Sequence, residues 1–301
     1  MAESEQSVPE IIADRFEVRR QVGRGGMGTV YLVHDRKHKR EMALKTLHRE
    51  LLDKPWVTAR FFREAKATRM LDHPGVVKIY GTYKSAEDLF YTMEYVRGKN
   101  LRSYMHKVGR LELSSVVHVL GMLSRALDYT HRFTIHRDVS PENIMVRKDG
   151  AIKLIDFGLA RLNDDEEELT IAGTGLGKAQ YHAPEQGIDA STCDHRADVY
   201  PLGVMFFELL THKRPDGELR LTKLVPQLPP SCDGLVLNAL AENPDERFPS
   251  AKAFHDALLA VYEDSKRLQA KRPFARLRRV FAVANPFKAV RRLLARSGRE
   301  E

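Results

Sequence analysis

The stretch His136-Arg137-Asp138-Val139-Ser140-Pro141-Glu142-Asn143, followed thirteen residues after Asn143 by Asp156-Phe157-Gly158, decides the fold of this 301-residue chain. Upstream of it lie a glycine-rich stretch, 23–30, and the run Met42-Ala43-Leu44-Lys45. Downstream lies Ala183-Pro184-Glu185. Each of these short patterns can occur by chance. Their occurrence together in one fixed order is not explained by chance.

The glycine-rich stretch has the pattern G-x-G-x-x-G-x-V, and its residues are Gly23, Arg24, Gly25, Gly26, Met27, Gly28, Thr29 and Val30. Glycines let a backbone approach phosphate oxygens and present N–H groups that no side chain covers. A dinucleotide-binding fold would require a helix to begin here, whereas a strand-like run follows. Gly-rich hairpins are common, so this pattern indicates phosphate binding only in the company of the others.

Strand-like runs dominate the first hundred residues, and helical periodicity dominates the rest. The predicted strands are 16–18, 29–33, 42–45, 76–80 and 89–96, and the predicted helices include 56–71, 113–129 and 202–210. This order predicts a small strand-rich half, a joint near 94–98 and a larger helical half. A ligand-binding cleft is expected where two such halves meet.

With these motifs in this order, the chain resembles the eukaryotic-like (Hanks-type) protein kinases, specifically the bacterial serine/threonine type. The resemblance extends from about Phe16 to about Tyr262. It implies an α+β, bilobal protein kinase fold and transfer of the γ-phosphoryl group of ATP to protein hydroxyls, including the enzyme's own, with ATP and Mg²⁺ as cofactors. The expected domains are a flexible N-terminus at 1–11, an N-lobe at 12–96, a C-lobe at 97–262 and a basic amphipathic C-terminal extension at 263–301.

The resemblance also implies residue roles. Asp138 accepts or orients the proton of the substrate hydroxyl, and Asn143 and Asp156 hold Mg²⁺. A single strand lysine is usually solvated, but here Lys45 is expected to pair with Glu64 and to hold the α- and β-phosphates. The implied nucleotide-binding residues are Gly23, Arg24, Gly25, Gly26, Met27, Gly28, Val30, Ala43, Lys45, Met93, Glu94, Val96 and Met145.

Three further residues have structural roles in the family. Glu185 and Arg247 resemble the buried ion pair that braces the peptide-docking lobe, in which Ala183-Pro184-Glu185 lies. Asp198 resembles the aspartate that anchors the catalytic loop. Tyr200-Pro201 replaces the family's usual Trp-Ser, and we expect only local adjustment because proline is tolerated early in a helix.

Two departures from the family pattern concern the chemistry itself. Ser140 stands where the family has a lysine that reaches the γ-phosphate, and Lys178 stands where it has a threonine. Our preferred hypothesis is an exchange, in which Lys178 supplies the missing ammonium and Ser140 the missing hydroxyl, so both are candidate catalytic residues. The alternatives are two independent losses in a crippled enzyme, or a pseudokinase that acts as a nucleotide-dependent binding module. A kinase-fold enzyme for small molecules and a tyrosine kinase both fit the motifs less well.

The segment between Asp156 and Ala183 is a candidate for regulation. Arg137 is of the type that pairs with a phosphate on this segment, for which Thr170 and Thr174 are the available hydroxyls. The acidic run 164–168 is either a solvated loop or a source of negative charge for Arg137 without phosphorylation.

The net charge of +8 is confined to the C-terminus, because 263–301 contain twelve Lys/Arg against four Asp/Glu. Apolar residues recur there every three or four positions, from Phe274 to Leu294, which is typical of a basic amphipathic helix. Such a helix suits an anionic membrane surface or a partner protein; packing on the kinase and disorder are the alternatives. No nucleic-acid-binding motif accompanies the charge, so no nucleic-acid partner is expected. The polar start at 1–5 and only two cysteines predict a cytoplasmic protein, which the extension could hold at the inner face of the membrane.

Overall fold

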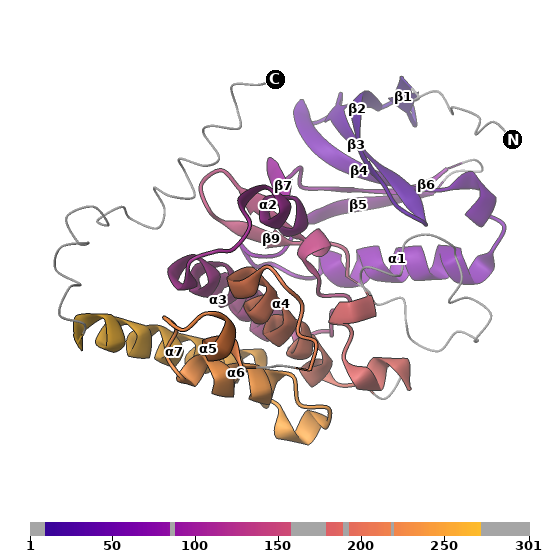
Figure 1. Ribbon diagram of the computed structural model, residues 1–301. Helices are drawn as coiled ribbons and strands as arrows, with labels where there is room; N and C mark the ends of the chain where they lie inside the picture. Colours follow the sequence, from indigo (N-terminus) through magenta and orange to yellow (C-terminus); the bar gives the residue numbers. More distant parts are fainter. Residues whose placement is uncertain (1–9, 85–87, 158–178, 189–192, 218–219, 272–301) are drawn as a thin grey trace, which may run out of the picture. The chain divides into compact units, whose positions relative to one another are not determined.

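The computed structural model describes residues 10–84, 88–157, 179–188, 193–217 and 220–271. These residues form two compact units, whose elements are labelled in Figure 1. The strand-rich unit contains residues 10–72 and 77–96. The helical unit contains residues 73–76 and the described residues from 97 onward.

The strand-rich unit contains one antiparallel six-stranded sheet, in the order β1-β2-β3-β4-β6-β5. Its strands are β1 (Ile11–Ile12), β2 (Phe16–Arg24), β3 (Gly28–Asp35), β4 (Arg40–Leu47), β5 (Ile79–Lys84) and β6 (Leu89–Met93). The strands predicted at 16–18, 29–33 and 42–45 are confirmed, and each is longer than its apolar run. The prediction of a strand at 76–80 is wrong at its start, because β5 begins only at Ile79. Val76 is buried instead by a parallel bridge to Leu154, inside the helical unit.

The two faces of this sheet have different partners. One face is covered by an apolar cluster made of Ile12, Phe16, Val33, Met42, Leu44 and Phe90. The opposite face packs against α1 (Pro55–Arg69), where the Phe61 ring lies 4.9 Å from the Tyr91 ring. This helix confirms the prediction at 56–71. Since Cβ atoms alternate along a strand, Lys45 and Tyr91, which are paired in register, lie on the α1 face.

The helical unit combines a small sheet with packed helices (Figure 1). Its elements are β7 (Gly98–Asn100), β8 (Ile144–Arg147), β9 (Ile152–Leu154), α2 (Leu101–Val108), α3 (Leu113–Thr130), α4 (Tyr200–Thr211), α5 (Leu221–Leu224), α6 (Ser231–Ala239) and α7 (Ala251–Lys271). The helices predicted at 113–129 and 202–210 are confirmed by α3 and α4. Every residue of α4 from Pro201 to Thr211 is buried, and Pro201 lies in its first turn, as expected for a proline that the helix tolerates.

The last described helix, α7, continues past residue 262 to Lys271, and so crosses the position at which we begin the C-terminal extension. Both cysteines of the chain, Cys193 and Cys232, are buried thiols. Among the helices of the described ranges, none combines the length and apolarity that a membrane span requires.

Candidate active site

The glycine-rich stretch forms the β2–β3 hairpin of the strand-rich unit. A Cβ on Gly23 would meet nothing within 4 Å, so the backbone there is open to a ligand. A Cβ on Gly28 would lie 1.9 Å from the carbonyl oxygen of Thr46, so this glycine is required for the close approach of β3 to β4. The turn is closed by the Gly25 N–H, which donates to the Gly28 carbonyl over 2.9 Å. Open backbone at Gly23 and close packing at Gly28 suit this hairpin to phosphate binding.

The ion pair predicted between β4 and α1 is present. Lys45 Nζ lies 3.4 Å from Glu64 Oε1, and the two side chains are only 14% and 10% exposed. Tyr91 donates a hydrogen bond from its hydroxyl to the same carboxylate oxygen, over 3.0 Å. Sequence reasoning missed Tyr91, since an aromatic residue within an apolar strand gives no polar signal. Glu64 is thus held from two strands, which fixes the direction of the Lys45 ammonium.

Three of the residues expected around adenine share the face of the sheet that carries Lys45. Val30 is paired in register with Lys45, and Ala43 with Met93, so their side chains point to the same side. The Glu94 N–H donates to the Lys78 carbonyl over 2.8 Å, which fixes the start of the expected hinge, and Val96 is buried. Met145, the remaining candidate, belongs to the helical unit, on β8.

The catalytic loop of the helical unit is anchored by Asp198, as expected. This fully buried carboxylate accepts hydrogen bonds from the backbone N–H groups of His136, over 2.8 Å, and Arg137, over 2.7 Å. His131 Nε2 lies 2.9 Å from the same carboxylate. Burial alone would raise the pKa of Asp198, but the hydrogen bond and charge of His131 outweigh it and hold that pKa below its ordinary value. Arg137 has a left-handed backbone (φ 63°), and its bond to Asp198 stabilises this conformation.

Within the loop, Asn143 orients Asp138. Its Nδ2 donates to both the backbone carbonyl and the Oδ2 atom of Asp138, at 2.8 Å each. Because this nitrogen is a donor to Asp138, a cation at Asn143 would be bound through the side-chain oxygen.

The second expected metal ligand, Asp156, lies at the same end of the β8–β9 hairpin as Asn143. Ile144 and Leu154 are paired in register, and the Ile155 N–H donates to the Asn143 carbonyl over 2.9 Å. Asp156 follows in a left-handed conformation (φ 52°). A carboxylate and an amide oxygen are hard oxygen ligands, so this donor set fits Mg²⁺.

Two histidines contact Asp138, and sequence reasoning assigned a role to neither. The buried His136 ring accepts the Asp138 N–H at Nδ1, over 3.3 Å, and its Nε2 lies 3.2 Å from the Ile155 carbonyl. Burial lowers the pKa of His136, which favours the neutral ring that this pair of contacts requires. His182 Nε2 lies 3.5 Å from Asp138 Oδ1. Isolated histidines carry no periodic signal, so only the fold reveals these contacts.

The residues of the proposed exchange differ in what the structure describes. Ser140 is fully buried, and its hydroxyl makes no hydrogen bond among the described residues. Lys178, Gly158, Thr170, Thr174 and the acidic run 164–168 lie outside the described residues, as does the extension beyond Lys271.

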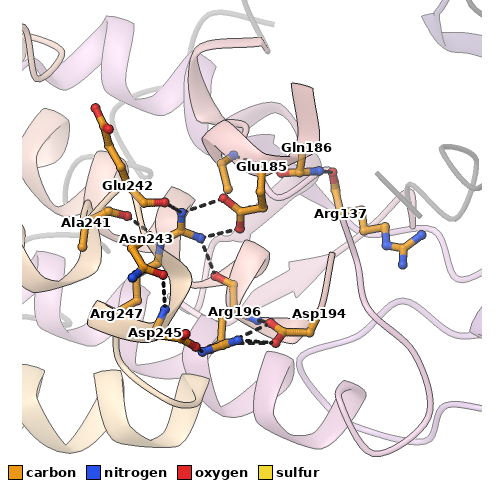
Figure 2. A network of polar contacts seen from close by, with 11 residues as sticks. Arg137, Glu185, Gln186, Asp194, Arg196, Ala241, Glu242, Asn243, Asp245 and Arg247 are labelled. Atoms are coloured by element: carbon orange, nitrogen blue, oxygen red, sulfur yellow. Dashed lines mark hydrogen bonds and ion pairs between the residues drawn. The ribbon is translucent and has the colours of Figure 1, made fainter. Parts of the chain in front are cut away.

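The ion pair that is expected to brace the peptide-docking lobe is formed, as Figure 2 shows. The Arg247 guanidinium binds both Glu185 carboxylate oxygens, over 2.5 and 2.6 Å, and also donates to the carbonyls of Ala241 and Glu242. Gln186 accepts from the Ala183 N–H and donates to the Arg137 carbonyl, over 3.0 and 2.9 Å. These contacts join the Ala183-Pro184-Glu185 segment to the catalytic loop.

The Arg137 side chain points away from this network (Figure 2). It is 7% exposed, and its Nη2 donates to the Cys193 carbonyl over 3.2 Å. Its Nε and Nη1 atoms are buried and make no hydrogen bond among the described residues. A buried guanidinium is suited to charge-assisted hydrogen bonds with an anion.

Comparison with known proteins identifies relatives over nearly the whole described chain. The chain is 34% identical over 278 residues to the serine/threonine-protein kinase PknB of Mycolicibacterium smegmatis, covering 85% of this chain and 44% of that protein. It is 36% identical over 270 residues to PknA of Mycobacterium tuberculosis, covering 83% of this chain and 62% of that one. The chain thus spans less than two thirds of these relatives.

Solved structures and a family model agree with these relatives. The crystal structure of the Mycobacterium tuberculosis PknI kinase domain matches with a TM-score of 0.68 at 28% identity, covering 84% of this chain and 98% of that one. The fold is therefore the bilobal protein kinase fold. A model described as protein kinase domain matches residues 16–273, which ends beyond Tyr262 and close to the end of α7. The chain belongs to the protein kinase domain family.

Proposed function

We propose that this chain is a serine/threonine protein kinase that transfers the γ-phosphoryl group of ATP to protein hydroxyls. The observation that carries the proposal is the geometry of the catalytic loop, in which Asn143 and the anchored backbone hold Asp138 in a fixed direction. The names of the relatives support an enzyme over a binding module. Incorporation of ³²P from [γ-³²P]ATP into the protein and into generic protein substrates tests it, with Asp138→Asn as the blank.

In this proposal the chain positions the reactants. Lys45, directed by Glu64, holds the α- and β-phosphates, and the backbone of the glycine hairpin covers them. Asp138 accepts or orients the proton of the attacking hydroxyl, for which its carboxylate is held by Asn143. Asn143 and Asp156 would hold Mg²⁺, which offsets negative charge on the phosphate oxygens.

We also propose that Lys178 supplies the ammonium that Ser140 cannot. The support is chemical: the buried hydroxyl of Ser140 carries no charge to place on the γ-phosphate, whereas a lysine stem is long enough to reach it from the next segment. Lys178→Ala should lower the transfer rate about 10²- to 10³-fold. Binding of ATP–Mg²⁺ should change little, since Lys45 and the glycine hairpin remain.

The matched control is Lys99→Ala, which removes an exposed lysine from β7. Unchanged turnover in Lys178→Ala would refute the exchange while leaving the kinase proposal intact.

Regulation of this activity is proposed to involve a phosphate near Arg137. The support is the buried guanidinium, whose Nε and Nη1 make no hydrogen bond among the described residues. Thr170 and Thr174 are the candidate acceptors, and Thr174 is the one we favour. Phosphatase treatment should lower activity, and Thr174→Ala should lower it to the same level. Full activity after complete dephosphorylation would favour the acidic run 164–168 as the source of charge.

The C-terminal extension is proposed to bind an anionic membrane surface. Residues 272–301 contain nine Lys/Arg and only two acids, and each basic residue near such a surface contributes about 1 kcal/mol. Co-sedimentation with phosphatidylserine vesicles tests this. The control is a chain truncated after Lys271, where α7 ends. Equal pelleting of the two proteins would exclude the membrane and leave a partner protein as the alternative.

A further inference from the structure

Arg102, on α2, is the centre of a polar network within the helical unit. Its Nε donates to Glu142 Oε1 and its Nη1 to Glu208 Oε1, each over 2.7 Å. Its Nη2 donates to the hydroxyl oxygen of Tyr181, and that hydroxyl donates to the second oxygen of Glu208. One guanidinium thus binds three side chains from three separate segments.

The three partners belong to the parts of the chain that the reaction needs. Glu142 directly precedes Asn143 in the catalytic loop. Tyr181 lies two residues before the Ala183-Pro184-Glu185 segment, and Glu208 lies on the buried helix α4. Arg102 therefore connects the catalytic loop to the peptide-docking segment through a rigid helix.

The contacts around Arg102 are shielded from solvent, and burial together with the Glu208 carboxylate keeps the Tyr181 hydroxyl protonated. The Arg102 and Glu208 side chains are 17% and 9% exposed, and Tyr181 is 1% exposed. Burial raises the pKa of Tyr181 and the neighbouring Glu208 raises it further, so its hydroxyl remains a donor. A second guanidinium, that of Arg214, lies 5.3 Å from the Tyr181 ring centroid, and that of Arg102 lies 5.4 Å from it.

Only an arginine at 102 can make this set of bonds. The planar guanidinium presents several N–H groups in a fixed fork, so it can serve Glu142, Glu208 and Tyr181 at once. A lysine would provide the same charge at a single point.

We propose that Arg102 is a positioning residue for the protein substrate, which holds the peptide-docking segment in register with the catalytic loop so that the substrate hydroxyl is presented to Asp138. The inference rests on the proposed kinase function. The main effect is expected on peptide binding, because the nucleotide-side side chains have partners of their own: Lys45 pairs with Glu64, and Asn143 bonds to Asp138.

The test is steady-state kinetics of the full chain, in which a phosphorylatable peptide and ATP are varied in turn. Arg102→Ala should raise the KM for peptide at least tenfold, as expected for the loss of charge-assisted hydrogen bonds. The KM for ATP should stay within about twofold, because the lost hydrogen bonds go to Glu142, Glu208 and Tyr181 and to none of the nucleotide-side residues. Arg102→Lys should restore part of the loss, and Tyr181→Phe, which removes one hydroxyl, should shift the peptide KM in the same direction. The control is Arg147→Ala, which removes an arginine whose side chain is 42% exposed and paired with Asp149.

Peptide KM values unchanged in both Arg102→Ala and Tyr181→Phe would overturn the inference. So would equal losses of peptide and ATP affinity, which indicate general damage to the fold. If Arg102→Ala does not fold, Tyr181→Phe and Arg102→Lys decide the question. Failure of the wild-type chain to phosphorylate any peptide would instead contradict the proposed function.

Discussion

Replacement of Asp198 by asparagine keeps the shape of the side chain but should weaken the hydrogen bonds that hold the catalytic loop. The Asp198 carboxylate accepts from two backbone N–H groups through different oxygens, Oδ1 for Arg137 and Oδ2 for His136. An amide has one oxygen and one NH₂ group, so whichever way the new side chain turns, at least one of these buried N–H groups faces a donor. The left-handed backbone of Arg137 then loses part of its support.

The magnitude follows from the bonds that are lost. A hydrogen bond to a charged acceptor contributes about 1.5–3 kcal/mol, and a buried unsatisfied donor costs about 1–3 kcal/mol. We expect Asp198→Asn to lower the free energy of unfolding by about 2–4 kcal/mol. Asp198→Ala should cost more, because it also leaves His131 without its partner.

Urea denaturation followed by circular dichroism measures this change, and ³²P transfer by the folded protein measures the effect on the loop. The matched control is Asp149→Asn, an aspartate that is 55% exposed, for which we expect a change within about 0.5 kcal/mol. If Asp198→Asn is as stable and as active as this control, Asp198 does not anchor the catalytic loop.

Three further predictions follow from the site. Gly28→Ala should lower the melting temperature in differential scanning calorimetry, because its Cβ would lie 1.9 Å from the Thr46 carbonyl oxygen; an unchanged value would show that β3 and β4 can separate. Lys45→Met should reduce ³²P transfer about 100-fold, and Glu64→Gln should reduce it less; equal transfer by Lys45→Met and wild type would remove Lys45 from the mechanism. Burial lowers the pKa of His136 in the folded state, so the unfolded state binds the proton first and stability should fall as the pH drops below about 6.5. Urea unfolding at three pH values should show that the free energy of unfolding depends less steeply on pH in His136→Phe than in the wild type. An identical pH dependence in the two proteins would contradict the lowered pKa of His136.

Local patterns predicted the elements that carry the chemistry. The glycine hairpin, β4 and α1 are each specified by a short run with its own punctuation or period, so Lys45 and Glu64 could be placed on them from the sequence. The Glu185–Arg247 pair and the Asp198 anchor were predicted through the family resemblance, because each joins residues far apart in the chain.

The sequence could not reveal where individual buried side chains would lie. Val76 is a β-branched residue in a strand-like run, yet it is buried against Leu154 outside the main sheet. Its position is determined by tertiary packing, which the local sequence does not show. Arg102 and Tyr181 stand among ordinary helix and loop residues, and their shared carboxylate lies on α4, which otherwise has the pattern of a buried apolar helix. Such contacts depend on the fold and leave no periodic signal.

In the proposed mechanism, Asp138 directs phosphoryl transfer from ATP to a protein hydroxyl. Its most direct test measures, on one preparation, ATP–Mg²⁺ binding by calorimetry and ³²P incorporation into a protein substrate, for the wild type and Asp138→Asn. We expect both proteins to bind ATP–Mg²⁺ with similar affinity, and only the wild type to produce phosphoserine or phosphothreonine. Binding without transfer by the wild type, or equal transfer by Asp138→Asn, would contradict the account.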